Sequence, residues 1–139
     1  MINKVKKNIE DKLKKLYKTY NIYLEDKQSD EILKPALKIK VDNKTTNYQR
    51  EKSIIKIKFD IVCLLDNDNK NELYWDISDK LDEELEILNL EGTLVRTGEK
   101  ISEISEGQLH YRFDTTLNLV KEKQQGNNIS SIVKEIKVI

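Results

Sequence analysis

The chain has 139 residues, of which 37% are hydrophobic and 36% are charged. This length suits one domain with a real core, and apolar residues in periodic blocks are not typical of a disordered chain. Twenty-five basic residues balance twenty-five acidic ones, so the net charge is zero. A neutral chain has no overall electrostatic attraction for nucleic acid or for an anionic membrane. Binding of either kind would need a local basic patch.

The N-terminal part of the chain predicts a helix followed by two strands. Residues 2–20 show no continuous apolar run for a signal peptide or a membrane span, so we expect synthesis in the cytosol. A short strand is expected over 21–27 and a second over 35–43, where Pro35 stands at the start. Apolar residues at intervals of three and four predict that the first segment is an amphipathic helix: Ile2, Val5, Ile9, Leu13, Leu16 and Tyr20.

The middle of the chain predicts a third strand and a second helix. Residues 53–65 alternate as a strand, and we interpret the lone Cys63 within it as a buried small hydrophobe. Residues 43–52 are polar and lack a tight-turn pair such as Asn-Gly, which predicts a long, mobile hairpin loop. Apolar residues at helical spacing over 73–88, followed by Gly92, predict the helix.

Two more strands are expected over 92–100 and 108–123. The order is then α-β-β-β-α-β-β, which predicts a single α+β domain over residues 1–123, with two helices packed on one face of a mainly antiparallel sheet. Residues 124–139 are interpreted as a linker and a C-terminal arm. The arm is either a last strand of this domain or a segment that docks on a neighbour.

The best candidate for chemistry is the only histidine, His110, which alternates with Arg112 and Asp114 on the last strand. A histidine near carboxylates can shuttle protons. The same alternation continues on other strands, so we interpret the trio as part of a charged sheet face and predict no catalytic residues. This face could track a phosphate backbone or meet an acidic subunit. Its other members are Lys38, Lys40, Lys56, Lys58 and Asp60.

Metal and nucleotide sites are not predicted. Asp66, Asp68 and Glu72 suggest a calcium loop, but Asn71 and Ile77 stand where that pattern requires glycine and an acid. A helix cap explains the same residues. The four glycines stand apart, which does not fit a phosphate cradle, so we predict no cofactor.

Two segments carry opposite charge. Residues 66–91 contain ten acidic residues against two lysines, whereas residues 2–20 contain seven lysines against Glu10 and Asp11. Opposite patches on one neutral chain suit head-to-tail association into rings. The alternative is that the two segments are simply helix faces exposed to solvent, which would explain the same composition.

Three stretches, residues 2–27, 50–88 and 92–123, together resemble the small tail terminator proteins of long-tailed bacteriophages and of phage-tail-like bacteriocins of Gram-positive hosts. The order of segments carries this resemblance, over about residues 1–123. It implies a structural role without a reaction. It further implies that a homo-hexameric ring forms on the finished tail tube, stops tube polymerisation and offers a surface to the head-tail connector. The protein would then be made in the host cytoplasm and become part of a virion or tail-like particle.

In such a ring we expect the hairpin loop, the charged sheet face and the arm to meet a neighbouring copy, the tail tube protein or the lumen through which DNA passes, with no membrane partner. Three alternatives stay open: a head-tail connector or tail completion protein, a small nucleic-acid-binding module, and an enzyme built on His110. The candidate interface residues are Tyr48, Arg50, Lys52, Lys56, Lys58, Asp60, His110, Arg112, Asp114, Ile132 and Ile136.

Overall fold

The computed structural model describes residues 1–24, 32–123 and 131–137, and it describes side chains as far as Val120. None of the helices in these ranges is long and apolar enough to cross a membrane. The elements in chain order are α1 (Ile2–Leu16), β1 (Asn21–Leu24), β2 (Ala36–Gln49), β3 (Lys52–Leu64), α2 (Lys70–Glu84), β4 (Ile87–Leu90), β5 (Thr93–Arg96), β6 (Ile101–Ser105), β7 (Gln108–Lys123) and β8 (Ser131–Lys137).

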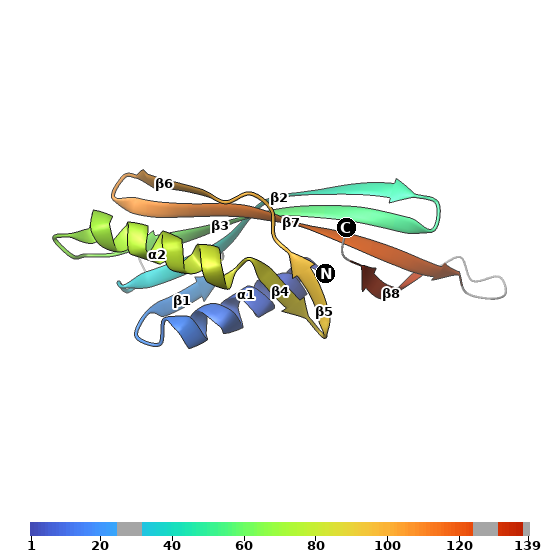
Figure 1. The fold of residues 1–139 in the computed structure, drawn as a ribbon, viewed down its shortest axis with the longest axis horizontal. Coiled ribbons are helices and arrows are strands. Elements are labelled where there is room, and N and C mark those ends of the chain that lie inside the picture. Colours follow the sequence, from blue (N-terminus) through green and yellow to red (C-terminus); the bar gives the residue numbers. More distant parts are fainter. Residues whose placement is uncertain (25–31, 124–130, 138–139) are drawn as a thin grey trace.

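Six of the strands form one sheet in the order β1-β2-β3-β7-β6, with β8 paired to the far half of β7 (Figure 1). β1 runs parallel to β2, and the other neighbours are antiparallel. β4 and β5 form a separate antiparallel pair. The predicted α+β class and mainly antiparallel sheet are confirmed, and the structure adds β4 and β6.

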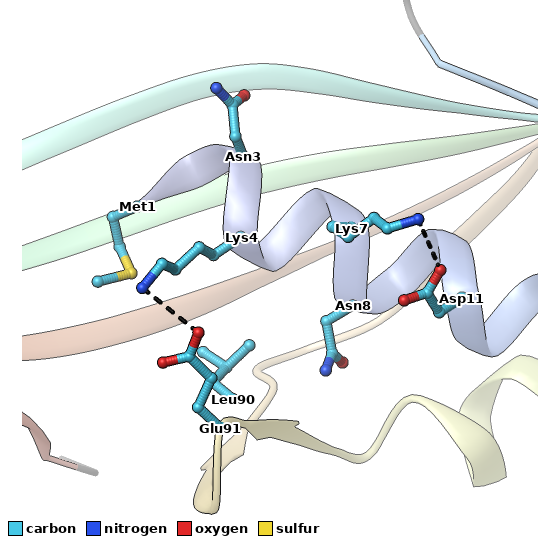
Figure 2. A pocket seen from close by; sticks show the side chains of 8 residues that line it. All are labelled: Met1, Asn3, Lys4, Lys7, Asn8, Asp11, Leu90 and Glu91. Carbon is cyan, nitrogen blue, oxygen red and sulfur yellow. Dashed lines mark ion pairs between the residues drawn. The ribbon is translucent and has the colours of Figure 1, made fainter.

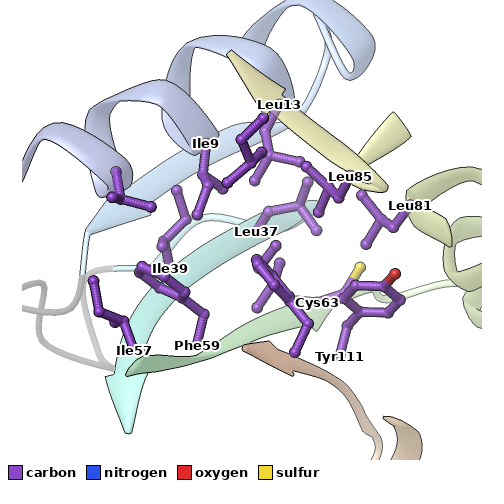
Figure 3. Packing of buried hydrophobic residues seen from close by; sticks show 14 of the residues in the cluster. Ile9, Leu13, Leu37, Ile39, Ile57, Phe59, Cys63, Leu81, Leu85 and Tyr111 are labelled. Atoms are coloured by element: carbon purple, nitrogen blue, oxygen red, sulfur yellow. The ribbon is translucent and has the colours of Figure 1, made fainter. Parts of the chain in front are cut away.

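The two helices lie on the same side of the sheet, and the core fills the space between helices and sheet (Figure 3). α1 turns Val5, Ile9 and Leu13 inward, and all three are fully buried. α2 contributes Leu81, and Leu85 follows at its C-terminal end, also fully buried. This spacing of three and four residues is the apolar stripe that the sequence predicted. The second helix is shorter than predicted, because it ends at Glu84 and Leu88 lies in β4.

The sheet turns an apolar face to the helices because its register aligns apolar side chains across three strands. Cross-strand neighbours share a face of the sheet and pack against each other. The Phe59 and Phe113 rings are one such pair, stacked with their centroids 5.4 Å apart. Three rows of this kind cross β2, β3 and β7: Leu37, Cys63 and Leu109; Ile39, Ile61 and Tyr111; and Val41, Phe59 and Phe113.

β2 reverses its two sides partway along its length. The pairing of β2 with β3 shifts register between Val41 and Asn43, because a bulge at Asp42 inserts one extra residue. Odd-numbered residues face the helices before the bulge, and even-numbered residues lie on that side after it. Tyr48 is therefore on the helix side of the sheet, opposite Ser53, where its side chain is 72% exposed.

The prediction of a long, mobile hairpin loop over residues 43–52 is wrong. β2 continues to Gln49 and β3 begins at Lys52, so two residues make the turn, and Arg50 takes a φ of +39°. Threonine and tyrosine in this stretch fit the pleated surface of a strand. The register across the hairpin therefore favours a tight turn, although its first residue is not the glycine or asparagine that such a backbone prefers.

Replacing Phe59 by alanine should lower the free energy of unfolding by about 3–5 kcal/mol, because it leaves a cavity where a fully buried ring stacked on Phe113. Lys58→Ala, at the exposed position beside it, should change that free energy by less than about 0.5 kcal/mol. Chemical denaturation of the three proteins measures both values. A loss of under about 1 kcal/mol for Phe59→Ala would contradict this packing.

Candidate functional site

A buried carboxylate organises the side of the sheet that faces away from the helices. Asp60 on β3 is 2% exposed and lies between Lys40 on β2 and Arg112 on β7 in the register of the sheet. His110 Nδ1 lies 2.9 Å from Asp60 Oδ2, and Arg112 Nε lies 3.7 Å from the same oxygen. Since a carboxylate only accepts hydrogen bonds, the His110 ring N–H is the donor.

The ionic cluster continues to the edge strand. The Arg112 guanidinium donates to Glu103 Oε2 on β6 at 3.1 Å, so one arginine connects a buried acid with an exposed one. Asp60 Oδ1 is buried and has no hydrogen-bond partner among the described residues. A buried carboxylate is costly unless it is paired, and His110 and Arg112 supply that pairing here. The side chains of His110 and Arg112 are thus both used to hold Asp60.

A second ionic contact lies farther along the same side. Lys56 Nζ is 3.9 Å from Asp114 Oδ2, and Lys58 stands opposite Asp114 in the register. The hollow at this place is lined by these three side chains together with Arg112 and Glu99, but neither Asp60 nor His110 belongs to its lining. This hollow therefore lies next to the His110–Asp60 pair, through Arg112, but that pair does not line it.

The structure brings together only part of the predicted interface set. Six of its members lie on the outward side of the neighbouring strands β3 and β7, as predicted. Tyr48, Arg50 and Lys52 lie instead at the far end of the β2–β3 hairpin. The side chains of Ile132 and Ile136 lie outside the described ones, although β8 itself pairs with β7.

One exposed aromatic side chain was missed by the sequence reasoning. Trp75 on α2 is 48% exposed, whereas its neighbour Tyr74 is fully buried. The signal was present in the sequence, because Trp75 falls outside the apolar stripe of its helix and stands among acidic residues. An exposed tryptophan in such a place is typical of a protein contact.

The groove between α1 and β4 carries charges that are already paired (Figure 2). Lys4 Nζ lies 3.4 Å from Glu91 Oε1, and Lys7 Nζ lies 3.0 Å from Asp11 Oδ1 and 3.3 Å from Glu10 Oε1. Hydrogen bonds to Asp11 and Glu10 raise the pKa of the Lys7 ammonium. The lysines of this groove are therefore occupied by acids of the same chain.

The described side chains do not favour a metal site or a reactive thiol. Among the described side chains, those of residues 1–24 and 32–120, no three histidine, cysteine or acidic groups form a cluster that could hold a metal ion. Cys63 is fully buried in the core, and burial raises the pKa of its thiol to about 12. A thiol with so little thiolate at neutral pH is a poor nucleophile.

The Cys63 thiol should react with an aromatic disulfide reagent at least about 100-fold more slowly in the native protein than in the unfolded protein at pH 8, because its thiolate is disfavoured and its sulfur is out of reach. The absorbance of the released thiolate measures both rates. The same sample in denaturant serves as the control. Comparable native and unfolded rates would contradict the burial.

Asp60 and His110 should show coupled effects on stability. We expect Asp60→Ala and His110→Ala to differ from additivity in the double variant by about 1 kcal/mol, because they remove the same hydrogen bond. Denaturant unfolding of the four proteins gives this coupling energy. The pair Lys44→Ala and His110→Ala is the control and should be additive within about 0.3 kcal/mol. Additivity of the first pair would show that the contact contributes nothing.

The class of protein is defined by the match of residues 4–127 to a known family, whose description is phage tail terminator protein. The chain belongs to this phage tail terminator family, which is a family of structural proteins and not of enzymes. It is therefore a structural component of a phage tail that works with other tail or head proteins. No curated protein matches the chain.

Proposed function

We propose that about six copies of this chain form a ring that caps the head-proximal end of the tail tube. The ring stops tube polymerisation and provides the surface on which the head-tail connector joins. DNA passes through its lumen only. The protein is made in the cytoplasm of the bacterial host and becomes part of the virion. Family membership over residues 4–127 carries this proposal.

The chemistry of the surface supports a role in contacts. The one histidine is used to hold Asp60, and Arg112 joins that acid to Glu103. Opposite charges on separate elements of a neutral chain favour head-to-tail association of identical copies. Residues 1–123 form the body of the subunit in this proposal, and residues 124–139 form an arm.

The predicted interface residues are assigned to two contacts in this proposal. The charged outward side of β3 and β7 faces the tube or the lumen, and the hairpin end with the arm faces the neighbouring copy. The members of the first group are Lys56, Lys58, Asp60, His110, Arg112 and Asp114, and those of the second are Tyr48, Arg50, Lys52, Ile132 and Ile136.

The purified protein should either form a ring of about six copies or convert from monomer to ring when tail tubes are added. Light scattering coupled to size exclusion, over a concentration series, gives the mass. In parallel, tubes assembled from tube protein should stop growing when the chain is added, as electron microscopy of tube lengths would show.

The control for tube growth is an equal amount of an unrelated protein of similar size. A monomer that leaves tube length unchanged would contradict the capping role. If that monomer also shifted labelled duplex nucleic acid in a salt-dependent manner, the nucleic-acid-binding alternative would replace it.

A further inference from the structure

The outward face of α2 carries a row of uncompensated acids. Glu72, Asp76, Asp79 and Glu83 are exposed and spaced by three or four residues, so they lie on one side of the helix. None of the four has an ion-pair partner in the part of the chain that the structure describes. We call these four residues, together with Trp75, the acidic face.

The other acids of α2 behave differently. Asp82 accepts a hydrogen bond from the Tyr111 hydroxyl at 2.8 Å, and Glu84 lies 3.6 Å from Lys80. The acids of the acidic face thus repel one another without compensation, and no basic residue stands in the last turn of α2 to complement the helix dipole. Stability of the single chain does not account for this arrangement.

Trp75 stands in the middle of this row. It follows Glu72 by three residues and precedes Asp79 by four, so it shares their side of α2, and 48% of it is exposed. A large aromatic ring surrounded by charged groups is the usual composition of a binding hot spot with a polar rim. The acidic face therefore fits a basic partner that also has an apolar or cationic side chain to pack on the indole ring.

The chain has two basic surfaces that could complement this face, and their ion pairs distinguish them. On α1, Lys4 is paired with Glu91, Lys7 with Asp11, and Lys14 is 3.8 Å from Glu10. Part of that surface is therefore compensated within the chain, and its exposed lysines without an ion-pair partner among the described residues are Lys15 and Lys18.

The second basic surface is the β2–β3 hairpin beyond the bulge, residues 42–58, which we call the hairpin arm. It carries five cationic residues and two acidic ones. Of the cations, Lys56 is paired with Asp114, while the other four have no ion-pair partner among the described residues. These four are Lys44, Arg50, Lys52 and Lys58, all of them exposed.

The acidic face and the end of the hairpin arm lie at opposite ends of the long axis of the molecule (Figure 1). They lie far apart in one chain, so they can meet only between copies. A contact between different surfaces of identical copies is heterologous and repeats head to tail, which gives a ring when the rotation closes.

We propose that the hairpin arm of one copy docks on the acidic face of α2 in the next copy, with Trp75 as the central anchor. Lys44, Arg50 and Lys52 of the arm pair with acids of that face, and a cation over the indole ring adds a cation–π contact. The inference rests on the proposed ring, because it names the two surfaces that join its subunits.

Two charge-reversed proteins test this contact. One carries Asp76→Lys with Asp79→Lys on α2, and the other carries Arg50→Glu with Lys52→Glu on the hairpin arm. Each alone should need at least about tenfold more protein to assemble, because like charges then meet at every contact. An equal mixture should assemble at the wild-type concentration as a ring of alternating copies, since each contact regains opposite charges.

The matched control is Lys15→Glu with Lys18→Glu, which reverses two exposed lysines in and just after α1. This protein should assemble as the wild type does. If instead it failed alone and assembled only when mixed with the α2 variant, α1 would be the basic partner and the hairpin arm would be excluded. Light scattering with and without tail tubes is the measurement for all mixtures.

Trp75 gives an independent readout because it is the only tryptophan of the chain. Its fluorescence should become less accessible to a soluble quencher when wild-type copies assemble, and Trp75→Ala should weaken assembly with unchanged circular dichroism. Rings whose Trp75 stays fully quenchable, or whose charge variants all assemble alike, would overturn this contact while the capping function stands. A wild type that never assembles, even with tubes, would overturn both.

Discussion

The long pairing of β3 with β7 determines where the apolar and the charged side chains of this protein lie. It runs from Cys63 opposite Leu109 to Lys52 opposite Val120. Side chains alternate along each strand and cross-strand neighbours share a face, so one register sends the apolar set to the helices and the ionic set to the other side. A slip of one residue would exchange the two faces and turn lysines into the core.

The buried ionic cluster also depends on the register between β3 and β7. Asp60 meets both His110 and Arg112 only in the observed register, because one is its direct neighbour on β7 and the other is two residues away on the same side. A buried charge that loses its partners is strongly unfavourable. The cluster therefore adds specificity to the pairing, and a histidine that could have suggested catalysis acts as part of the sheet.

Much of this fold could be predicted from periodicity alone. The apolar spacing of the two helices and the alternation of residues 53–65 and 108–123 are visible in the order of the amino acids. The side of Tyr48 could not be predicted, because the bulge at Asp42 is a property of pairing between strands. The tight turn at Arg50 has no local signature either, and only the register across the hairpin determines it.

The candidate contact surfaces were predictable to a similar degree. Composition separates a basic first helix from an acidic second segment, but it does not show which charges are already paired. The sequence alone does not distinguish Lys7 from Lys58. In the structure, Lys7 pairs with Glu10 and Asp11 of its own helix, whereas Lys58 has no ion-pair partner among the described residues. Exposed charges are screened within about 10 Å in salt, so an ion pair formed inside the subunit leaves little attraction for another copy. The hairpin arm thus keeps four cations without an ion-pair partner among the described residues, whereas three of the lysines on α1 are already paired.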